Sequence, residues 1–216
     1  MIGTLVLNYK IVKQIGEGGM GTVYLGKHTT LDRNVAIKVL LPEFARNTEI
    51  KERFINEART LSKLSHQNIV TLYDFAELDG NLFLIMEYVE GLPLDDYLKQ
   101  SNTKDEFIAT NIFIQILNGF EYAHNKGIVH RDIKPANIIL SNEAVPKILD
   151  FGIAKIVQGD IRLTKTGMKM GSVLYMSPEQ ILGKDVDFRS DIYSLGITLY
   201  ELLVGRNPYD YKSKSE

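Results

Sequence analysis

The sequence of 216 residues contains no cysteine, so disulfide bonds and thiolate metal sites are excluded and a reducing compartment is permitted. No apolar run approaches the roughly 18 residues that a membrane span needs. Residues 1–7 lack the basic region and the cleavage site of a secretory signal. We therefore expect a cytoplasmic location and no membrane contact from this segment, although a longer parent chain could carry an anchor.

An excess of charge of one sign is also missing. The chain has 25 Lys and Arg against 27 Asp and Glu, a formal net charge of -2 and a pI near 6.1. This balance provides no general attraction to nucleic acid or to an anionic membrane, so we expect no nucleic-acid partner. A hydrophobic fraction of 44% and a charged fraction of 24% are typical of a globular chain that buries a substantial core.

One stretch near the middle of the chain carries polar side chains at short, fixed offsets. Residues 130–137 read HRDIKPAN, and residues 150–152 read DFG. Asp132 can accept a hydrogen bond from an attacking alcohol, and Lys134 can lie over a transferring phosphoryl group. Asn137 and Asp150 are hard oxygen ligands of the kind that Mg²⁺ prefers. DFG alone is weak evidence, and a basic surface turn before a short strand is the alternative, but most positions of HRDxKxxN are fixed.

These motifs resemble those of the eukaryotic-type (Hanks-type) protein kinases, whose catalytic loop reads HRDxxxxN and whose metal loop reads DFG. Lys134 matches the serine/threonine branch, and GGMG, HRDIKPAN and SPEQ resemble the bacterial members. The resemblance implies an α+β, bilobal kinase fold. Residues 1–88 would form an N-lobe with a five-stranded antiparallel sheet and one helix, and residues 89–216 a partial, mainly helical C-lobe.

A glycine-rich stretch follows the first predicted strand. Residues 9–15 alternate apolar and polar side chains, which predicts a half-buried strand. Gly16, Gly18 and Gly21 would let backbone amides approach phosphate oxygens closely. A second strand from Val23 favours strand–loop–strand over the Rossmann turn, which opens a helix. An ordinary glycine-rich hairpin stays open as the alternative.

Residues 34–40 read as a strand with one interior lysine, Lys38, which either reaches solvent or is held by a partner. The Val-Ala-Ile-Lys match implies that Lys38 grips the α- and β-phosphates. Residues 48–64 predict a helix with one apolar stripe. Glu57 beside this stripe is either a solvated helix glutamate or, as the resemblance implies, the partner that orients Lys38.

Residues 69–76 and 81–89 predict two strands around an Asp-Gly hairpin turn. Met86 falls at the family's gatekeeper position, with residues 87–89 as the adenine-binding hinge, although Met86 can also be simply core. Pro93 stands where relatives have a ribose-contacting polar residue, and Asp96 is a weak substitute. The resemblance implies that the ATP site contains Ile15, Gly16, Gly18, Gly21, Val23, Ala36, Lys38, Met86, Glu87, Val89 and Ile139.

A capping-box pattern at residues 103–106 predicts a long helix that stops at Gly127, with His124 as a face residue near its end. Short strands at 138–140 and 147–149 would place Asn137 and Asp150 side by side. Residues 187–204 are apolar nearly all round, which predicts a buried helix. Asp191 inside it needs hydrogen bonds, and the resemblance implies that it anchors the catalytic-loop backbone.

The activation segment would run from Asp150 to Glu179. A phosphate on Thr164 or Thr166 would pair with Arg131 and order the loop, whereas the alternative is two hydroxyls in a flexible segment. Ser172 keeps a hydroxyl for Asp132 and Lys134. Glu179 pairs in the family with an arginine from a part that this sequence does not contain, so we expect no partner for it.

The resemblance implies transfer of the γ-phosphoryl of ATP to Ser/Thr hydroxyls of proteins, with Mg²⁺ or Mn²⁺. The implied catalytic residues are Asp132, Lys134, Lys38 and Glu57. It also allows two kinase domains to pair for autophosphorylation. The alternative is a nucleotide-binding, catalytically impaired fragment or pseudokinase-like scaffold, because the family's later helices are missing. We therefore expect a longer form to melt at a higher temperature.

Overall fold

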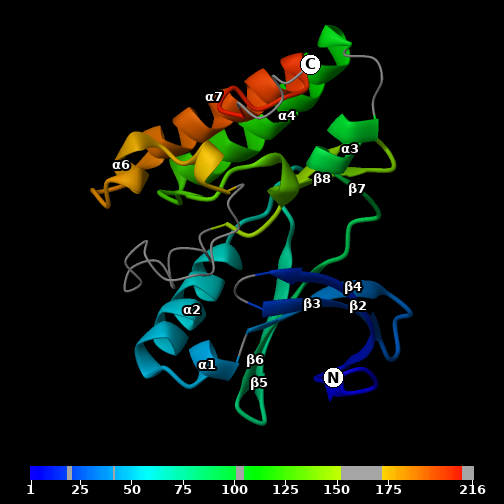
Figure 1. Ribbon diagram of the computed structural model, residues 1–216. Helices are drawn as coiled ribbons and strands as arrows, with labels where there is room; N and C mark the ends of the chain where they lie inside the picture. Colours follow the sequence, from blue (N-terminus) through cyan, green and yellow to red (C-terminus); the bar gives the residue numbers. More distant parts are fainter. Residues whose placement is uncertain (19–20, 41, 101–104, 152–171, 211–216) are drawn as a thin grey trace. The chain divides into compact units, whose positions relative to one another are not determined.

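A computed structural model describes residues 1–18, 21–40, 42–100, 105–151 and 172–210 of the chain (Figure 1). The described residues form two compact units, the first from 1–65 and 70–88, and the second from 66–69, 89–151 and 172–210. Residues 66–69 were predicted to belong with the first unit. They group with the second because Asn68 Nδ2 donates to the Pro146 carbonyl (3.0 Å) and Ile69 bridges to Ile148.

The first unit is built on an antiparallel sheet of six strands in the order β1-β2-β3-β4-β6-β5. Its strands are β1 (Leu5–Val6), β2 (Tyr9–Gly18), β3 (Gly21–His28), β4 (Asn34–Leu40), β5 (Leu72–Leu78) and β6 (Asn81–Glu87). The predicted number of five strands was wrong. The extra strand, β1, pairs only Leu5 with Lys10 and Val6 with Tyr9. Two residues are too few to show the alternation that identifies a strand in sequence.

Two helices, α1 (Pro42–Ala45) and α2 (Thr48–Leu61), follow β4, and α2 begins at an N-cap where Asn47 accepts from the Ile50 N–H. Alternation along the strands divides the unit into two cores. One core joins α1 and α2 to the sheet through Leu40, Ala45, Ile50, Phe54, Ala58, Leu82 and Leu84. The other contains Val35, Ile37, Val39, Phe83 and Ile85. Lys38 lies between members of the second core in sequence, so its side chain belongs to the α2 face.

The second unit pairs two long helices with a small sheet in the order β7-β8-β9. Its elements are β7 (Gly91–Pro93), α3 (Leu94–Gln100), α4 (Glu106–Asn125), η1 (Pro135–Asn137), β8 (Ile138–Ser141), β9 (Pro146–Ile148), η2 (Ser172–Tyr175), α6 (Pro178–Ile181) and α7 (Phe188–Val204). Helices α4 and α7 lie side by side (Figure 1). No helix in the described part of the chain is long and apolar enough to cross a membrane.

The ends of α4 differ in how well the sequence predicted them. Its N-cap is Asp105, which accepts from the N–H groups of Phe107 and Ile108, rather than Thr103 of the predicted box. An aspartate caps a helix as well as a threonine does, so the motif alone could not choose between them. The stop at Gly127 is confirmed, because this glycine has φ +73° just after the helix.

Helix α7 is buried along one face only. Asp191, Ser194, Leu195, Thr198 and Leu202 are buried, whereas Phe188, Ile192 and Tyr200 are exposed. The predicted burial of this helix is therefore confirmed for one face and wrong for the other. The exposed side chains are apolar, so apolar composition did not distinguish the two faces.

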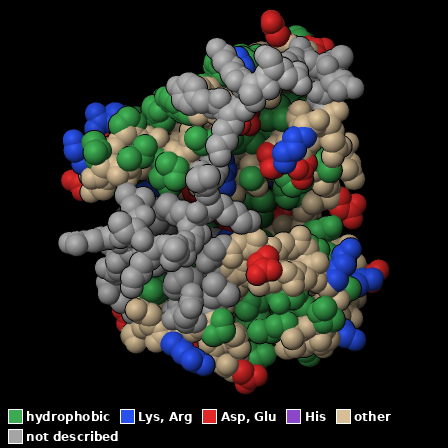
Figure 2. All heavy atoms as spheres, in the orientation of Figure 1, with side chains coloured by type: hydrophobic (Ala, Val, Ile, Leu, Met, Phe, Trp, Pro, Cys, Tyr) green, Lys and Arg blue, Asp and Glu red, His purple; other side chains and the backbone are tan. Residues whose placement is uncertain are grey.

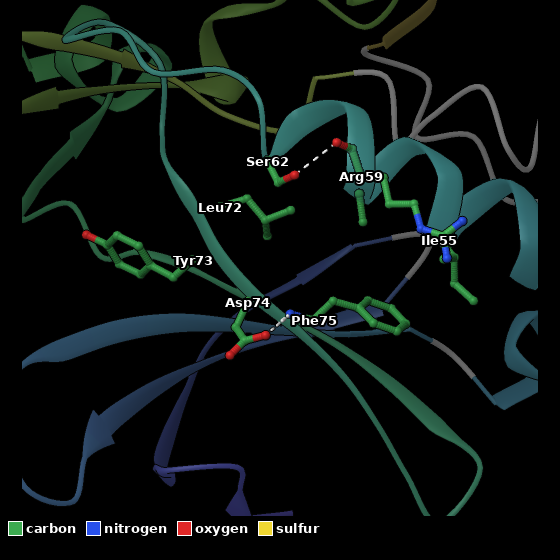
Figure 3. A pocket seen from close by; sticks show the side chains of 8 residues that line it. Ile55, Arg59, Ser62, Leu72, Tyr73, Asp74 and Phe75 are labelled. Carbon is green, nitrogen blue, oxygen red and sulfur yellow. Dashed lines mark hydrogen bonds between the residues drawn. The ribbon is translucent and has the colours of Figure 1, made fainter.

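A pocket of about 420 Å³ lies between α2 and β5 within the first unit (Figure 3). Ile55 and Arg59 reach into it from α2, and Leu72 and Phe75 line it from β5. Its lining includes none of the residues predicted to bind ATP. On the face of the molecule drawn in Figure 2, described Lys and Arg side chains lie among Asp and Glu rather than in one basic stripe.

Candidate active site

The carboxylate of Asp132 is the centre of the polar cluster in the second unit. Lys134 Nζ lies 2.8 Å from its Oδ2 and 3.0 Å from its Oδ1. Asn137 Nδ2 donates to the same Oδ2 (2.9 Å) and to the Asp132 carbonyl (2.7 Å). These residues are five apart at most, and the short 3₁₀ helix η1 turns Asn137 back onto Asp132. The spacing in HRDIKPAN therefore yields one preorganised carboxylate.

Lys134 also connects this loop to η2. Its Nζ donates to Ser172 Oγ at 3.0 Å, as predicted for the serine that replaces threonine in the family pattern. One ammonium thus bridges the Asp132 carboxylate and a hydroxyl that lies 38 residues beyond Lys134 in sequence. Its side chain is 19% exposed, and that of Asp132 is 26% exposed, so a solvent-borne molecule can still reach this pair.

Asn137 and Asp150, the predicted metal ligands, come from neighbouring backbone segments. The Leu149 N–H donates to the Asn137 carbonyl at 2.9 Å, which brings the residue before Asp150 onto Asn137. Asp150 has φ +53°, a left-handed conformation that few non-glycine residues adopt. Since Asn137 Nδ2 is bound to Asp132, its amide oxygen is the atom that suits a hard cation.

The described residues contain no group of three or more His, Cys, Asp or Glu side chains that could hold a metal ion by itself. An amide and a carboxylate nevertheless fit a Mg²⁺ bound together with a phosphate ligand. That cation typically takes only one or two protein ligands besides phosphates and water. The donor set therefore fits a metal ion that binds together with a nucleotide better than a metal ion held by the protein alone.

His130 stabilises the start of the loop at residues 130–137 through contacts of its buried ring. Its ring is fully buried, with Nε2 2.7 Å from the Leu149 carbonyl and Nδ1 accepting from the Asp132 N–H at 3.2 Å. A carbonyl can only accept and an N–H can only donate, so the contacts specify a neutral ring protonated at Nε2. The Phe151 ring of the DFG motif packs against His130 at 4.7 Å between centroids.

Asp191 of α7 anchors the same loop. Its side chain is 1% exposed, and its oxygens accept from the N–H groups of His130 and Arg131, each at 2.8 Å. His124 Nε2 is the third partner at 2.8 Å. The predicted anchoring by Asp191 is thus present in the structure. The prediction of His124 as a plain face residue was wrong, because α4 and α7 pack so that the two side chains meet.

The regulatory prediction concerns Arg131, Thr164 and Thr166. Arg131 has φ +69°, and its guanidinium donates to the Val186 carbonyl at 3.5 Å. Thr164 and Thr166 lie outside the described residues. Pairing of Arg131 with a phosphothreonine therefore stays a prediction.

Glu179 has a partner that the sequence did not suggest. Ser190 Oγ at the start of α7 donates to its carboxylate, and this hydrogen bond holds the pKa of Glu179 below its ordinary value. The expectation that Glu179 has no partner was therefore wrong. The two residues are only 11 apart, but nothing in their sequence pattern marks the serine as the donor.

A second, partly buried contact joins η2 to α7. Tyr175 OH donates to Glu201 Oε2 at 2.5 Å. Burial, followed by the Glu201 interaction, raises the pKa of Tyr175. Burial also raises the pKa of Glu201, although the Tyr175 hydrogen bond opposes this shift. Desolvation of the Glu201 side chain thus disfavours its charged form in the folded chain.

We expect Glu201→Gln to raise the melting temperature at pH 7, because the amide oxygen still accepts from Tyr175 and no charge is desolvated. A raised carboxyl pKa stabilises the folded chain at low pH, and that contribution is lost as pH rises above the ordinary value of 4.5. A gain of about 2 °C is expected for a chain of this size. Thermal unfolding at pH 7 and pH 4.5 would show the gain shrinking at the lower pH. An equal loss at both values would contradict the prediction.

Several residues predicted to bind ATP lie together in the first unit. Val23 pairs with Lys38, and Lys38 with Leu84. Two residues away in the same ladder, Ala36 pairs with Met86. Directly paired residues and those two apart share one face of a sheet, so Val23, Ala36, Lys38 and Met86 face the same side. Lys38 is only 8% exposed and therefore does not extend into solvent.

Strands β2 and β3 on either side of the glycine-rich segment pair antiparallel, which confirms strand–loop–strand over a helix-opening turn. A Cβ at Gly21 would lie 2.0 Å from the Val39 carbonyl oxygen, so this glycine is required by the close approach of β3 and β4. Cβ atoms at Gly16 and Gly18 would meet nothing closer than 3.8 Å and 3.9 Å. Packing explains Gly21, but it does not explain Gly16 or Gly18.

The remaining predicted residues are placed less completely. Glu57 lies in α2, but its side chain is outside the described part, so its pairing with Lys38 stays a prediction. The Glu87 carboxylate accepts from the Thr71 N–H at 3.2 Å. In the second unit, Ile139 pairs with Pro93. Ile15 is an exposed residue of β2. At Val89 the chain passes from the first unit into the second.

Comparisons with known proteins agree with this geometry. The family model described as "Protein kinase domain" matches residues 9–216. Serine/threonine-protein kinase PrkC of Bacillus subtilis is 45% identical over 205 residues, which cover 95% of this chain and 32% of that protein. Probable serine/threonine-protein kinase PknB of Lactococcus lactis is 43% identical over 203 residues, with 94% and 32% covered.

Solved structures give the same result. The crystal structure of the Mycobacterium tuberculosis PknI kinase domain superposes with a TM-score of 0.75 at 29% identity, covering 100% of this chain and 80% of that one. The fold and the site define a protein kinase domain of the Hanks type, similar to bacterial members. The chain belongs to the protein kinase domain family, and it spans about a third of the length of the two curated relatives.

Proposed function

We propose that this chain transfers the γ-phosphoryl group of ATP to Ser or Thr hydroxyls of proteins. The observation that supports this most is the bridge formed by Lys134 Nζ between the Asp132 carboxylate and the Ser172 hydroxyl. A base for an alcohol and a cation for a phosphoryl oxygen lie within one hydrogen bond of each other. The curated relatives carry the name serine/threonine-protein kinase, which agrees with this activity.

Asp132 accepts the hydrogen bond of the attacking hydroxyl and orients it toward phosphorus. General-base assistance of this kind contributes about 10²–10⁴-fold. Lys134 offsets negative charge on the transferring group. Because the transition state of phosphoryl transfer is loose, positioning and charge stabilisation supply most of the rate. The contacts of Lys134 and Asn137 hold the carboxylate in place before substrate arrives, which avoids reorganisation during reaction.

Asn137 and Asp150 would hold Mg²⁺, or Mn²⁺, against the phosphates. The metal supplies neutralisation of phosphate charge. In the first unit, Lys38 would hold the α- and β-phosphates with Glu57 as its partner. Gly16 and Gly18, which packing leaves unexplained, would let backbone N–H groups approach the phosphates.

The adenine and ribose would contact Ile15, Val23, Ala36, Met86, Glu87, Val89 and Ile139. The alternative of an impaired, nucleotide-binding scaffold predicts loss of a catalytic group. Lys38, Asp132, Asn137 and Asp150 are all present in this chain, so we favour the active enzyme.

The test is transfer of label from ATP to a peptide that contains Ser and Thr. Label in the γ position should appear on the peptide, label in the α position should not, and a matched peptide with Tyr in place of Ser and Thr should stay unlabelled. Chelation of divalent metal should abolish transfer, and added Mg²⁺ should restore it. Transfer that survives chelation, or equal labelling of the Tyr peptide, would count against the proposal.

Regulation is tested in the same reaction mixture. We expect Thr164 and Thr166 to acquire phosphate when the chain is incubated with Mg-ATP, with a rate that rises with protein concentration because two kinase domains react. Mass spectrometry of the activation segment locates the phosphate. Modification at other sites alone would refute this part of the proposal.

A further inference from the structure

Gln180 occupies the third position of the short helix α6. Its Oε1 accepts from the Ser177 N–H at 3.0 Å, and the Ser177 hydroxyl accepts from the Gln180 N–H at 3.4 Å. Ser177 is fully buried. The two residues thus form a reciprocal capping box, which satisfies N–H groups at the start of the helix.

The other end of the same amide reaches the catalytic loop. Gln180 Nε2 donates to the Arg131 carbonyl at 2.7 Å, across 49 residues of sequence. That carbonyl belongs to the peptide group joining Arg131 to Asp132. The N–H of this peptide donates to His130 Nδ1 at 3.2 Å, so Gln180 and His130 hold its two ends.

This peptide group requires external support. Arg131 has φ +69°, a conformation that is costly for a residue with a long side chain. Its own N–H is held by Asp191 at 2.8 Å. The contacts of Asp191, His130 and Gln180 therefore determine the orientation of the backbone immediately before the Asp132 side chain.

We propose that Gln180 is a positioning residue for Asp132, acting through the Arg131 carbonyl, in addition to its role as a cap. The proposal rests on the phosphotransferase function stated above. In this proposal, the start of α6 fixes the position of the Asp132 carboxylate relative to Lys134. Loss of the Nε2 donor leaves a carbonyl of the loop without its partner, and Asp132 then samples orientations unsuited to the hydroxyl.

The chemistry of the cap makes this role separable from a structural one. A capping box is served by Glu as well as by Gln, and a negative charge at a helix N-terminus is favourable. A carboxylate accepts from the Ser177 N–H as the amide oxygen does, but it cannot donate to a carbonyl. Gln180→Glu therefore keeps the cap and removes only the contact with Arg131.

The experiment compares the whole chain with Gln180→Glu, and uses Gln115→Glu on α4 as a matched control remote from the site. We expect Gln180→Glu to unfold at the wild-type temperature or slightly above it. Its kcat should fall roughly tenfold, the effect of one unsatisfied hydrogen-bonding group, with little change in KM for ATP. Gln115→Glu should leave kcat unchanged. Gln180→Met, which removes both contacts, should lose stability as well as kcat.

The pH dependence of kcat is a measurement that a purely structural role of Gln180 would not change. Protonation turns the Glu side chain into an O–H donor, so the ratio of wild-type to Gln180→Glu kcat should shrink as the pH is lowered toward 5. The ratio isolates this group because all other titratable groups are the same in both proteins. A ratio independent of pH, or a kcat equal to that of wild type at pH 7, would overturn the proposal.

Hydrogen exchange tests the positioning role of Gln180 without an activity measurement. We expect the amides of residues 130–132 to exchange faster in Gln180→Glu than in wild type, while those of α4 do not change. Unchanged exchange at 130–132 would overturn the positioning role. A wild-type chain that transfers no phosphate would instead count against the proposed function, and the exchange result would still stand.

Discussion

Replacing Asp132 with Asn is expected to lower kcat by about 10²–10⁴-fold, the range that a positioned general base supplies. An amide cannot take the proton of the attacking hydroxyl, but it keeps the size of the side chain. One amide oxygen can still accept from Lys134, whose Nζ now lies 2.8 Å from Oδ2. The fold should therefore survive, and KM for ATP should change far less than kcat. Steady-state kinetics with a Ser/Thr peptide measure both.

The matched control is Asp79→Asn in the turn between β5 and β6. Asp79 has φ +51°, which Asn tolerates well, so the control makes the same chemical change without strain. Its kcat should equal that of wild type. If Asp132→Asn retained kcat within threefold of wild type, Asp132 would have no role in proton transfer.

Replacing Asp191 with Ala is expected to destabilise the chain by about 3–5 kcal/mol, the range for breaking a buried charged network. Three donors lose their acceptor together, namely the N–H groups of His130 and Arg131 and the ring of His124. The Asp191 side chain is only 1% exposed, so solvent water does not take the place of the lost carboxylate. The melting temperature should fall by roughly 2–4 °C for each kcal/mol. Phosphotransfer should fall as well, because the loop before Asp132 loses its anchor.

Asp187→Ala serves as the control at the N-cap of the same helix. Asp187 accepts from the Arg189 N–H at 2.9 Å at an exposed position, so its loss should lower the melting temperature much less than loss of Asp191. Thermal or urea unfolding compares the two variants. A loss in Asp191→Ala no greater than that in Asp187→Ala would show that the buried carboxylate is not an anchor.

The sequence predicted well whatever depends on neighbours along the chain. The interior strand that carries Lys38 was placed at its observed bounds, 34–40, because β-branched residues and turn signals define it. The cluster of Asp132, Lys134 and Asn137 followed from spacing within one loop. Elements without enough residues to show a period, such as β1, were missed for that reason.

Other errors come from contacts between side chains that no sequence pattern marks. His124 was interpreted as a face residue, yet it binds Asp191, 67 residues away. Ser190 was not recognised as the partner of Glu179. The Val39 carbonyl forbids a side chain at Gly21, a packing reason that the sequence did not show, and the phosphate contact of Gly21 stays a prediction.

By itself, the sequence determined the main strands, the long helices and the family to which the chain belongs, because short fixed offsets and alternation are local properties. Only the tertiary structure decided that Gln180 from α6 supports the same backbone segment as Asp191, whose anchoring role the family resemblance had implied. These hydrogen bonds join backbone groups to side chains up to 61 residues away, and no sequence period records which helix packs against which loop.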